Sequence, residues 1–221
     1  MPLVNYCGFW PPVIALRPIL AAQKHFKAKD SDIILSTMPK SGTTWLKALM
    51  FSIVNRNAIP IDQSPLLTST PHMLVPALDF GVYWDQENPD LENILKTIGS
   101  VCLHPFHLSN EVGKGTDPVA IDEAFDMYCQ GISAYGPFWD DILGYWNAHL
   151  ENPGKSVVSQ VRGSERGYPV SGDINGIAKN SSFFGKGQVG DWTNYLTPAM
   201  ADRMKKLMDT KFEGSGLMFK T

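Results

Sequence analysis

The sequence predicts an α/β protein in which helices flank a parallel sheet, and two neighbouring patterns carry that prediction. Residues 33–35 form a short apolar run rich in β-branched side chains, which is typical of a strand buried in a parallel sheet. Residues 45–54 then carry apolar side chains at helical spacing, directly after a break at residues 39–42. We therefore predict a strand, a tight loop and a helix over residues 32–57.

Length and composition indicate one folded domain that spans residues 1–221. The chain is 43% hydrophobic and 11% aromatic, which fits a globular protein with a substantial core. Its formal net charge of -3 excludes a general electrostatic attraction to nucleic acid or to acidic membranes. Any anion site must therefore be local.

The sequence also favours a soluble, cytoplasmic protein. Residues 1–20 lack the basic region of a signal peptide, and no apolar run is long enough to cross a bilayer. Cys7, Cys102 and Cys129 are widely spaced, without a Cys-x-x-Cys pair, which indicates a reducing compartment and structural thiols. We expect no membrane partner and no nucleic-acid partner.

The first half of the chain, outside the strand and helix described above, is predicted to be less regular. Residues 1–12 are aromatic and turn-like, and we expect a strap packed on the core. A helix is predicted from Pro18, because proline is favoured at a first helical position. Prolines punctuate residues 58–90, which predicts loops and short turns. The apolar side chains of residues 58–90 are expected to cover the core or, alternatively, to line a pocket for a hydrophobic ligand.

The second half of the chain is predicted to be mainly helical. A short helix is expected over residues 88–98 and a strand over residues 156–161. Seven glycines in residues 163–190 indicate a long flexible segment. Cap and proline signals predict three further helix starts, at Asp117-Pro118, Pro137 and Thr197-Pro198.

The loop after the predicted strand has the chemistry of an anion-binding site. A helix N-terminus presents unpaired backbone N–H groups and the positive end of the helix dipole. Lys40 adds a charge, and hydroxyl groups are added by Ser41, Thr43 and Thr44. The P-loop of ATP and GTP enzymes requires Gly-x-x-x-x-Gly-Lys-Ser/Thr, whereas here Lys40 precedes Gly42. This order argues against a nucleoside triphosphatase or a nucleotide kinase.

Residues 39–45, Pro-Lys-Ser-Gly-Thr-Thr-Trp, resemble the 5'-phosphosulfate loop of cytosolic sulfotransferases, in particular the plant members. Those enzymes use 3'-phosphoadenosine 5'-phosphosulfate (PAPS) as sulfuryl donor. The resemblance extends to Tyr-Cys-Gly-Phe-Trp at residues 6–10, to the helices over residues 123–150 and to Lys-Gly-Gln-Val-Gly-Asp-Trp at residues 186–192. It implies a single domain with the three-layer sulfotransferase fold, a P-loop-like parallel sheet flanked by helices.

The resemblance also implies roles for individual residues in binding PAPS, with no metal. Lys40 would be catalytic, because it would neutralise the oxygen that bridges sulfur and phosphorus. Trp45 would stack on adenine. The 3'-phosphate would be reached by Lys186 and Gly187, with Ser100 in the place of the family's accompanying serine. The 5'-phosphate would be held by Ser41, Gly42, Thr43 and Thr44.

The catalytic base has two alternative assignments. The family's base is a His in a Thr-His-Leu-Pro-Phe context, and residues 103–107 are Leu-His-Pro-Phe-His. One alignment makes His104 the base that takes the proton from the acceptor hydroxyl. The other places this stretch in a later Trp-His-Phe element of the family, so that the catalytic stretch is missing. A metal site of Cys102, His104 and His107 is disfavoured because no fourth ligand is apparent.

Two apparent internal deletions separate this chain from the family. The family's strand with Cys-Arg-Asn-Pro-Lys-Asp, whose Arg binds the 3'-phosphate, has no counterpart. The segment between residues 158 and 180 is mostly lost or replaced, and Gly185 stands where the family has an Arg. Losing two arginines should weaken PAPS binding. Losing a central strand predicts an incomplete sheet.

Two functions of different classes follow from these observations. The leading hypothesis is a PAPS-dependent sulfotransferase that acts on the hydroxyl of a small apolar acceptor, such as a flavonoid, steroid, hydroxy acid or desulfo-glucosinolate. The alternative is a catalytically inactive homologue that binds only a nucleotide or a partner. The enzyme hypothesis requires binding of adenosine 3',5'-bisphosphate (PAP), the desulfated product of the donor.

Overall fold

The computed structural model describes residues 2–30, 32–37, 41–85, 89, 100–102, 119–154, 173–174, 178–179 and 190–218. The chain divides into two compact units. The first comprises Met1–Val13, Gly115–Ser164 and Gln188–Thr221, and the second comprises Ile14–Lys114 and Glu165–Gly187. Apart from residue 89, the helix predicted over residues 88–98 and the strand predicted over residues 156–161 lie outside the described residues.

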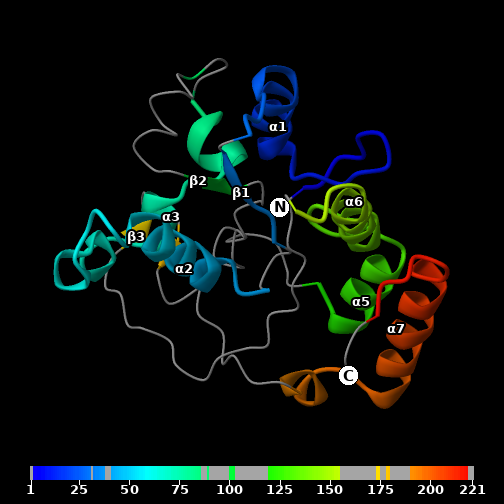
Figure 1. Cartoon of the computed structure of the whole chain (residues 1–221). Helices are drawn as coiled ribbons and strands as arrows, with labels where there is room; N and C mark the ends of the chain where they lie inside the picture. Colours follow the sequence, from blue (N-terminus) through cyan, green and yellow to red (C-terminus); the bar gives the residue numbers. More distant parts are fainter. Residues whose placement is uncertain are drawn as a thin grey trace. The chain divides into compact units, whose positions relative to one another are not determined.

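The second unit contains the strand, loop and helix that the sequence predicts. Strand β1 is Ile33–Leu35 and helix α2 is Thr43–Asn55 (Figure 1). β1 pairs in parallel with strand β2, Ser100–Cys102, with Leu35 opposite Cys102. The predicted parallel pairing is confirmed. We did not predict β2, because a run of three residues that includes a serine gives too short an apolar signal.

Helix α2 buries a different face from the one that its apolar residues predict. Its two buried side chains are Lys47 and Phe51, four residues apart and therefore on one face. Leu49 and Ile53, which were expected to face the core, are 40% and 50% exposed. The apolar pattern therefore predicted the helix correctly and its orientation only in part.

Residues 58–85 form the short turns that the prolines predict. Two hydrophobic clusters contain most of the buried hydrophobic side chains of this region. Val75 packs with Phe51 of α2, and Leu78 packs in a cluster with Ala21 of the first helix. The expected covering role is confirmed for these side chains. The four turns are Ile61–Gln63, Pro65–Leu67, helix α3 at Pro71–Leu74 and the turn Leu78–Val82.

The first helix, α1, spans Val13–His25 and so begins before the predicted start at Pro18. Pro18 lies inside the helix and is buried. A proline in that position removes one backbone N–H, and here the loss is tolerated within a helix whose apolar residues begin at Val13. The prediction from proline alone was therefore wrong about where the helix starts.

In the first unit, residues 2–12, where a strap is predicted, make backbone contacts with one another and with residue 136. Backbone bridges pair Leu3 with Pro12 and Tyr6 with Phe9. The Trp10 N–H donates to the Gly136 carbonyl over 3.0 Å. The strap is therefore fixed by backbone hydrogen bonds both to itself and to the turn at Gly136.

The described residues of the first unit also form three α-helices: α5 at Ile121–Cys129, α6 at Phe138–Glu151 and α7 at Pro198–Lys211. The predicted starts of α6 and α7 are confirmed. α5 begins at Ile121, after the predicted start at Asp117-Pro118, and Ala120 at its N-cap provides no side-chain cap. Within the part of the chain that the structure describes, no helix has the length and apolar character needed to cross a bilayer.

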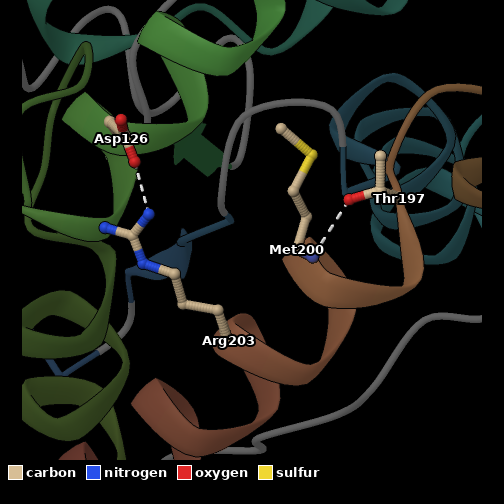
Figure 2. Close-up of polar contacts among 4 residues, drawn as sticks. All are labelled: Asp126, Thr197, Met200 and Arg203. Carbon is tan, nitrogen blue, oxygen red and sulfur yellow. Dashed lines mark hydrogen bonds and ion pairs between the residues drawn. The ribbon is translucent and has the colours of Figure 1, made fainter.

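Polar and aromatic contacts join α7 to α5 and α6. Arg203 of α7 forms an ion pair with Asp126 of α5 (Figure 2). The Lys211 ammonium lies 4.6 Å from the centre of the Trp139 ring of α6. The Trp146 indole N–H donates to the Ser215 carbonyl over 2.8 Å. These contacts connect α7, and the residues that follow it, to α5 and α6.

Candidate functional site

The candidate site is the N-terminus of α2, where the chain turns from β1 into the helix. Gly42 is the N-cap residue and has φ 96° and ψ 20°. This left-handed conformation is costly for any residue with a Cβ, so the turn favours glycine at this position. The glycine of the predicted loop therefore has a structural reason to be there.

The first turn of α2 leaves its backbone donors open to a ligand. Helix geometry leaves the first N–H groups without a backbone partner, and Gly42 has no side chain that could cap them. The first intrahelical bond runs from the Leu46 N–H to the Gly42 carbonyl over 3.0 Å. The N–H groups of Thr43, Thr44 and Trp45 therefore lie at the positive end of the helix dipole, which favours an anion.

Hydroxyl groups of the same turn are held by specific partners. The Thr43 hydroxyl oxygen lies 2.7 Å from that of Thr37, which follows β1. The Thr44 hydroxyl oxygen lies 3.0 Å from Nε2 of His72 in α3. These contacts link the helix start both to the end of the strand and to α3.

His72 also contacts a buried cation. Its Nδ1 lies 3.2 Å from the ammonium nitrogen of Lys47, whose side chain is only 2% exposed. Burial, and to a smaller extent the neighbouring charge of Lys47, together lower the pKa of His72 from 6.5 to about 3. The imidazole is therefore neutral at physiological pH.

Trp45 is the third residue of α2 and remains 47% exposed. An indole that is accessible next to open backbone donors has a free face on which a planar ring can stack. The structure thus brings the positive end of a helix dipole and an accessible aromatic side chain onto the same turn.

The structure brings together the predicted residues Ser41, Gly42, Thr43, Thr44 and Trp45. The backbone of Ser100 lies in β2 opposite Ile33, at the start of both strands, whereas the loop follows their ends. Within the described ranges no group of three or more His, Cys, Asp or Glu side chains could hold a metal ion. The remaining predicted site residues lie outside the described residues: Lys40, His104, Lys186 and Gly187.

Two residues of this site, Lys47 and His72, were not predicted from the sequence. Lys47 stands alone among the apolar residues of α2, and a lone lysine in such a helix could have marked a buried cation. His72 follows Pro71 in a segment predicted as loop, and nothing local in the sequence connects it with Thr44, 28 residues away. Their pairing depends on the packing of α3 against α2.

Comparison with known proteins identifies the family. The family model described as "Sulfotransferase domain" matches residues 30–104 and 166–216, which include the whole candidate site. Cytosolic sulfotransferase 15 of Arabidopsis thaliana is 32% identical over 294 residues, covering 99% of this chain and 82% of the relative. Cytosolic sulfotransferase 5 of the same plant is 31% identical, covering 98% of this chain and 90% of the relative.

Solved structures agree with this match. A crystal structure of an Arabidopsis thaliana protein assigned as a steroid sulphotransferase has a TM-score of 0.70 and 32% identity, with 99% of this chain and 89% of that chain covered. The mouse sulfotransferase SULT7A1, solved with PAP, has a TM-score of 0.58 at 18% identity, with 96% and 95% covered, and supports the fold alone.

The fold is therefore that of the sulfotransferases. The chain belongs to the sulfotransferase family, whose members are enzymes. The alignment with the first relative spans 294 residues, more than the 221 of this chain, so that relative has residues without a counterpart here. That difference fits the internal deletions that the sequence predicts.

Proposed function

We propose that this protein transfers a sulfuryl group from PAPS to the hydroxyl of a small apolar acceptor. The observation that carries the proposal is the start of α2, where the left-handed Gly42 leaves the first backbone donors uncapped. The sulfotransferase family match over residues 30–104 supports a phosphosulfate as the anion.

The described residues fit the 5'-phosphate of the donor. Three backbone N–H groups and the hydroxyls of Thr43 and Thr44 lie at the positive end of one helix, and charge-assisted hydrogen bonds of this kind are the strong ones. Trp45, with its accessible indole, is the candidate partner for adenine. Lys186 and Gly187 are proposed for the 3'-phosphate on the resemblance of their sequence motif.

The proposed reaction exchanges one sulfur–oxygen bond for another. The acceptor oxygen attacks sulfur in line with the departing oxygen, which leaves on PAP, and the acceptor proton passes to a base. Lys40 is proposed to neutralise the departing oxygen. His104 is the candidate base, with the alternative that this stretch belongs to a later element of the family.

The relatives support the proposed acceptor class and location. The name of the Arabidopsis structure refers to a steroid, which is a small apolar molecule, and the curated relatives are named as cytosolic enzymes. We therefore propose a cytosolic enzyme with a small-molecule partner, without a nucleic-acid or membrane partner. Catalysis is proposed to need no metal.

Isothermal titration of the full chain with PAP tests donor binding. We expect saturable binding with one site, and binding that Thr44→Val weakens. A folded chain without detectable PAP binding would rule out the enzyme. It would favour the second candidate, an inactive homologue, which Gly185 in the place of an arginine supports.

Transfer of labelled sulfate from PAPS to a panel of flavonoid, steroid and hydroxy-acid acceptors tests turnover. His104→Ala should lower kcat about a hundredfold or more if His104 is the base. Unchanged turnover in that variant would exclude His104 as base and leave the rest of the proposal in place. PAP binding without transfer to any acceptor would again favour the inactive homologue.

A further inference from the structure

The starting observation is a buried lysine that contacts a histidine next to the proposed anion site. Lys47 is 2% exposed, and its ammonium nitrogen lies 3.2 Å from Nδ1 of His72. An ammonium group has only donors. The Nδ1 atom must therefore be the acceptor in this contact, and so it carries no proton.

This assignment fixes the tautomer of the imidazole. A neutral ring with an unprotonated Nδ1 carries its proton on Nε2. Nε2 lies 3.0 Å from the Thr44 hydroxyl oxygen. The ring therefore donates its Nε2–H to Thr44, and the Thr44 oxygen accepts.

The role of Thr44 follows from that direction. A hydroxyl has one hydrogen to donate, and once its oxygen accepts from His72 that hydrogen remains for another acceptor. Thr44 is the second residue of α2, where the open N–H groups of the first turn also point. An anion at the helix start is the acceptor that suits both kinds of donor.

We propose that Lys47 and His72 are positioning residues that make the Thr44 hydroxyl a hydrogen-bond donor to the phosphosulfate of the donor nucleotide. The inference rests on the proposed function, because it takes the anion to be the 5'-phosphosulfate of PAPS. Neither residue touches the nucleotide: Lys47 sets the tautomer, His72 sets the direction of one hydrogen bond, and Thr44 makes the contact.

Electrostatics agree with this arrangement. Protonating His72 would place a second N–H against the Lys47 ammonium, and burial together with that charge keeps the imidazole pKa near 3. The relay therefore stays in one state across the physiological pH range. If Lys47 had no role beyond its burial, an apolar side chain of similar length could replace it at little cost in stability.

Imidazole 15N spectra of the full chain, without ligand, test the tautomer directly. His72 is assigned as the signal lost in His72→Gln, among the five histidines of the chain. We expect the chemical shift of an unprotonated nitrogen for Nδ1 and of a protonated nitrogen for Nε2. Lys47→Met should raise the population of the other tautomer. A protonated Nδ1 in the wild type would overturn the proposal.

Two substitutions of His72 test the direction of the second bond. The amide nitrogen of Gln can replace the Nε2 donor, whereas Asn keeps an acceptor near Nδ1 but is too short to reach Thr44. We expect His72→Asn to weaken PAP binding about tenfold, and His72→Gln to stay within about twofold of wild type. His149→Asn in α6 is the matched control, with unchanged PAP affinity. Equal losses in both His72 variants would contradict the proposal.

A double-mutant cycle separates positioning from a structural role. If His72 acts through Thr44, then His72→Asn should cause no further loss of PAP affinity in a Thr44→Val background. Additive losses would overturn the relay. A wild-type chain that binds no PAP would instead refute the proposed function, while the tautomer measurement would still decide how Lys47 and His72 are arranged.

Discussion

Helices α2 and α7 begin in opposite ways, and the difference separates a binding site from a structural helix end. At α7 the Thr197 hydroxyl oxygen accepts from the Met200 N–H over 3.3 Å, and Pro198 at the first position has no N–H (Figure 2). At α2 the cap is Gly42, which has no side chain. At α7 one donor is capped by a side chain and another is absent, whereas the first donors of α2 have no side-chain cap.

The same contrast holds for the residues that follow each cap. The Thr44 hydroxyl of α2 is held by His72, and Lys47 lies buried one turn further on. α7 has no buried residue, and its Arg203 makes an exposed ion pair with Asp126. Burial of polar groups around one helix start is expensive unless they are paired, and at α2 His72 contacts both Thr44 and Lys47, which supports the proposed binding role.

The largest expected effect is on the core beneath α2. Phe51→Ala should lower the free energy of unfolding by about 3–5 kcal/mol, because it opens a cavity beside the buried Val75. Leu207→Ala in α7, where the side chain is only half-buried, should cost clearly less. Urea unfolding of both variants measures the difference. Equal losses would mean that the two helices are anchored alike.

Acid should weaken the attachment of α2. The pKa of His72 is about 3 in the folded chain and 6.5 ordinarily, so the unfolded chain binds a proton first as the pH falls. The contribution of neutral His72 to the free energy of unfolding is complete above pH 6.5, and about 2 kcal/mol of that free energy is lost by about pH 5. Unfolding free energies of wild type and His72→Gln between those values measure it. Parallel pH profiles would contradict the assignment.

Asp141, in the first unit, should change stability with pH in the direction opposite to His72. Burial, and then the neighbouring Asp140, raise the pKa of Asp141 from 3.8 to about 6. The folded chain therefore holds a proton that the unfolded chain has lost, and stability falls as the pH rises from about 4 to 6. Asp141 is present in both wild type and His72→Gln, so its opposing effect cancels when the pH profiles of their unfolding free energies are subtracted.

The glycine cap can be tested by adding a side chain. Gly42→Val should lower stability by about 1–2 kcal/mol, because φ 96° is strained for a β-branched residue, and it should also weaken PAP binding. Gly144→Ala in α6 is the control, since a Cβ there meets nothing within 4 Å and alanine favours helices. Thermal unfolding and PAP titration measure both. Unchanged PAP affinity in Gly42→Val would show that the Gly42 cap is not part of the binding site.

The threonines at the two helix starts, Thr44 and Thr197, should differ in whether their substitution changes PAP affinity. Thr44→Val should weaken PAP binding about tenfold and also lower stability by about 1–3 kcal/mol, because it leaves the His72 Nε2–H without its acceptor. Thr197→Ala should cost about 1 kcal/mol of stability, through loss of the cap, and leave PAP affinity unchanged. Titration and thermal unfolding of both variants give the four values. A loss of affinity in Thr197→Ala would end the contrast between the two helix starts.

The smallest effect is expected at the exposed ion pair between Arg203 and Asp126. Arg203→Ala should change the unfolding midpoint very little, because both side chains of the Arg203–Asp126 pair are more than half exposed. Its guanidinium also lies 5.6 Å from the centre of the Phe125 ring. Thermal unfolding at low and high salt checks the pair, with Arg203→Lys as control. A large loss of stability would show that this contact matters more than its exposure suggests.

Local signals predicted the elements that position the candidate site. The β-branched run at residues 33–35, the glycine in the loop and the helical spacing after it each act within a few residues, so sequence alone is sufficient. The start of α7 was predicted for the same reason, because its cap is a contact between Thr197 and Met200.

Features that depend on distant packing were not predictable in this way. His72 meets Thr44 and Lys47 only because α3 packs on α2, and no local pattern contains that contact. The burial of Lys47 in place of Leu49 has the same origin. α5 begins later than its proline suggests, and α1 begins earlier, because neighbouring residues outweigh a single propensity.

Amide chemical shifts of the full chain during titration with PAP test the central claim most directly. We predict that the largest shifts occur at the N–H groups of Thr43, Thr44 and Trp45, with the Met200 N–H unchanged because Thr197 already holds it. Saturable shifts elsewhere with none at the start of α2, or equal shifts at both helix starts, would contradict the account.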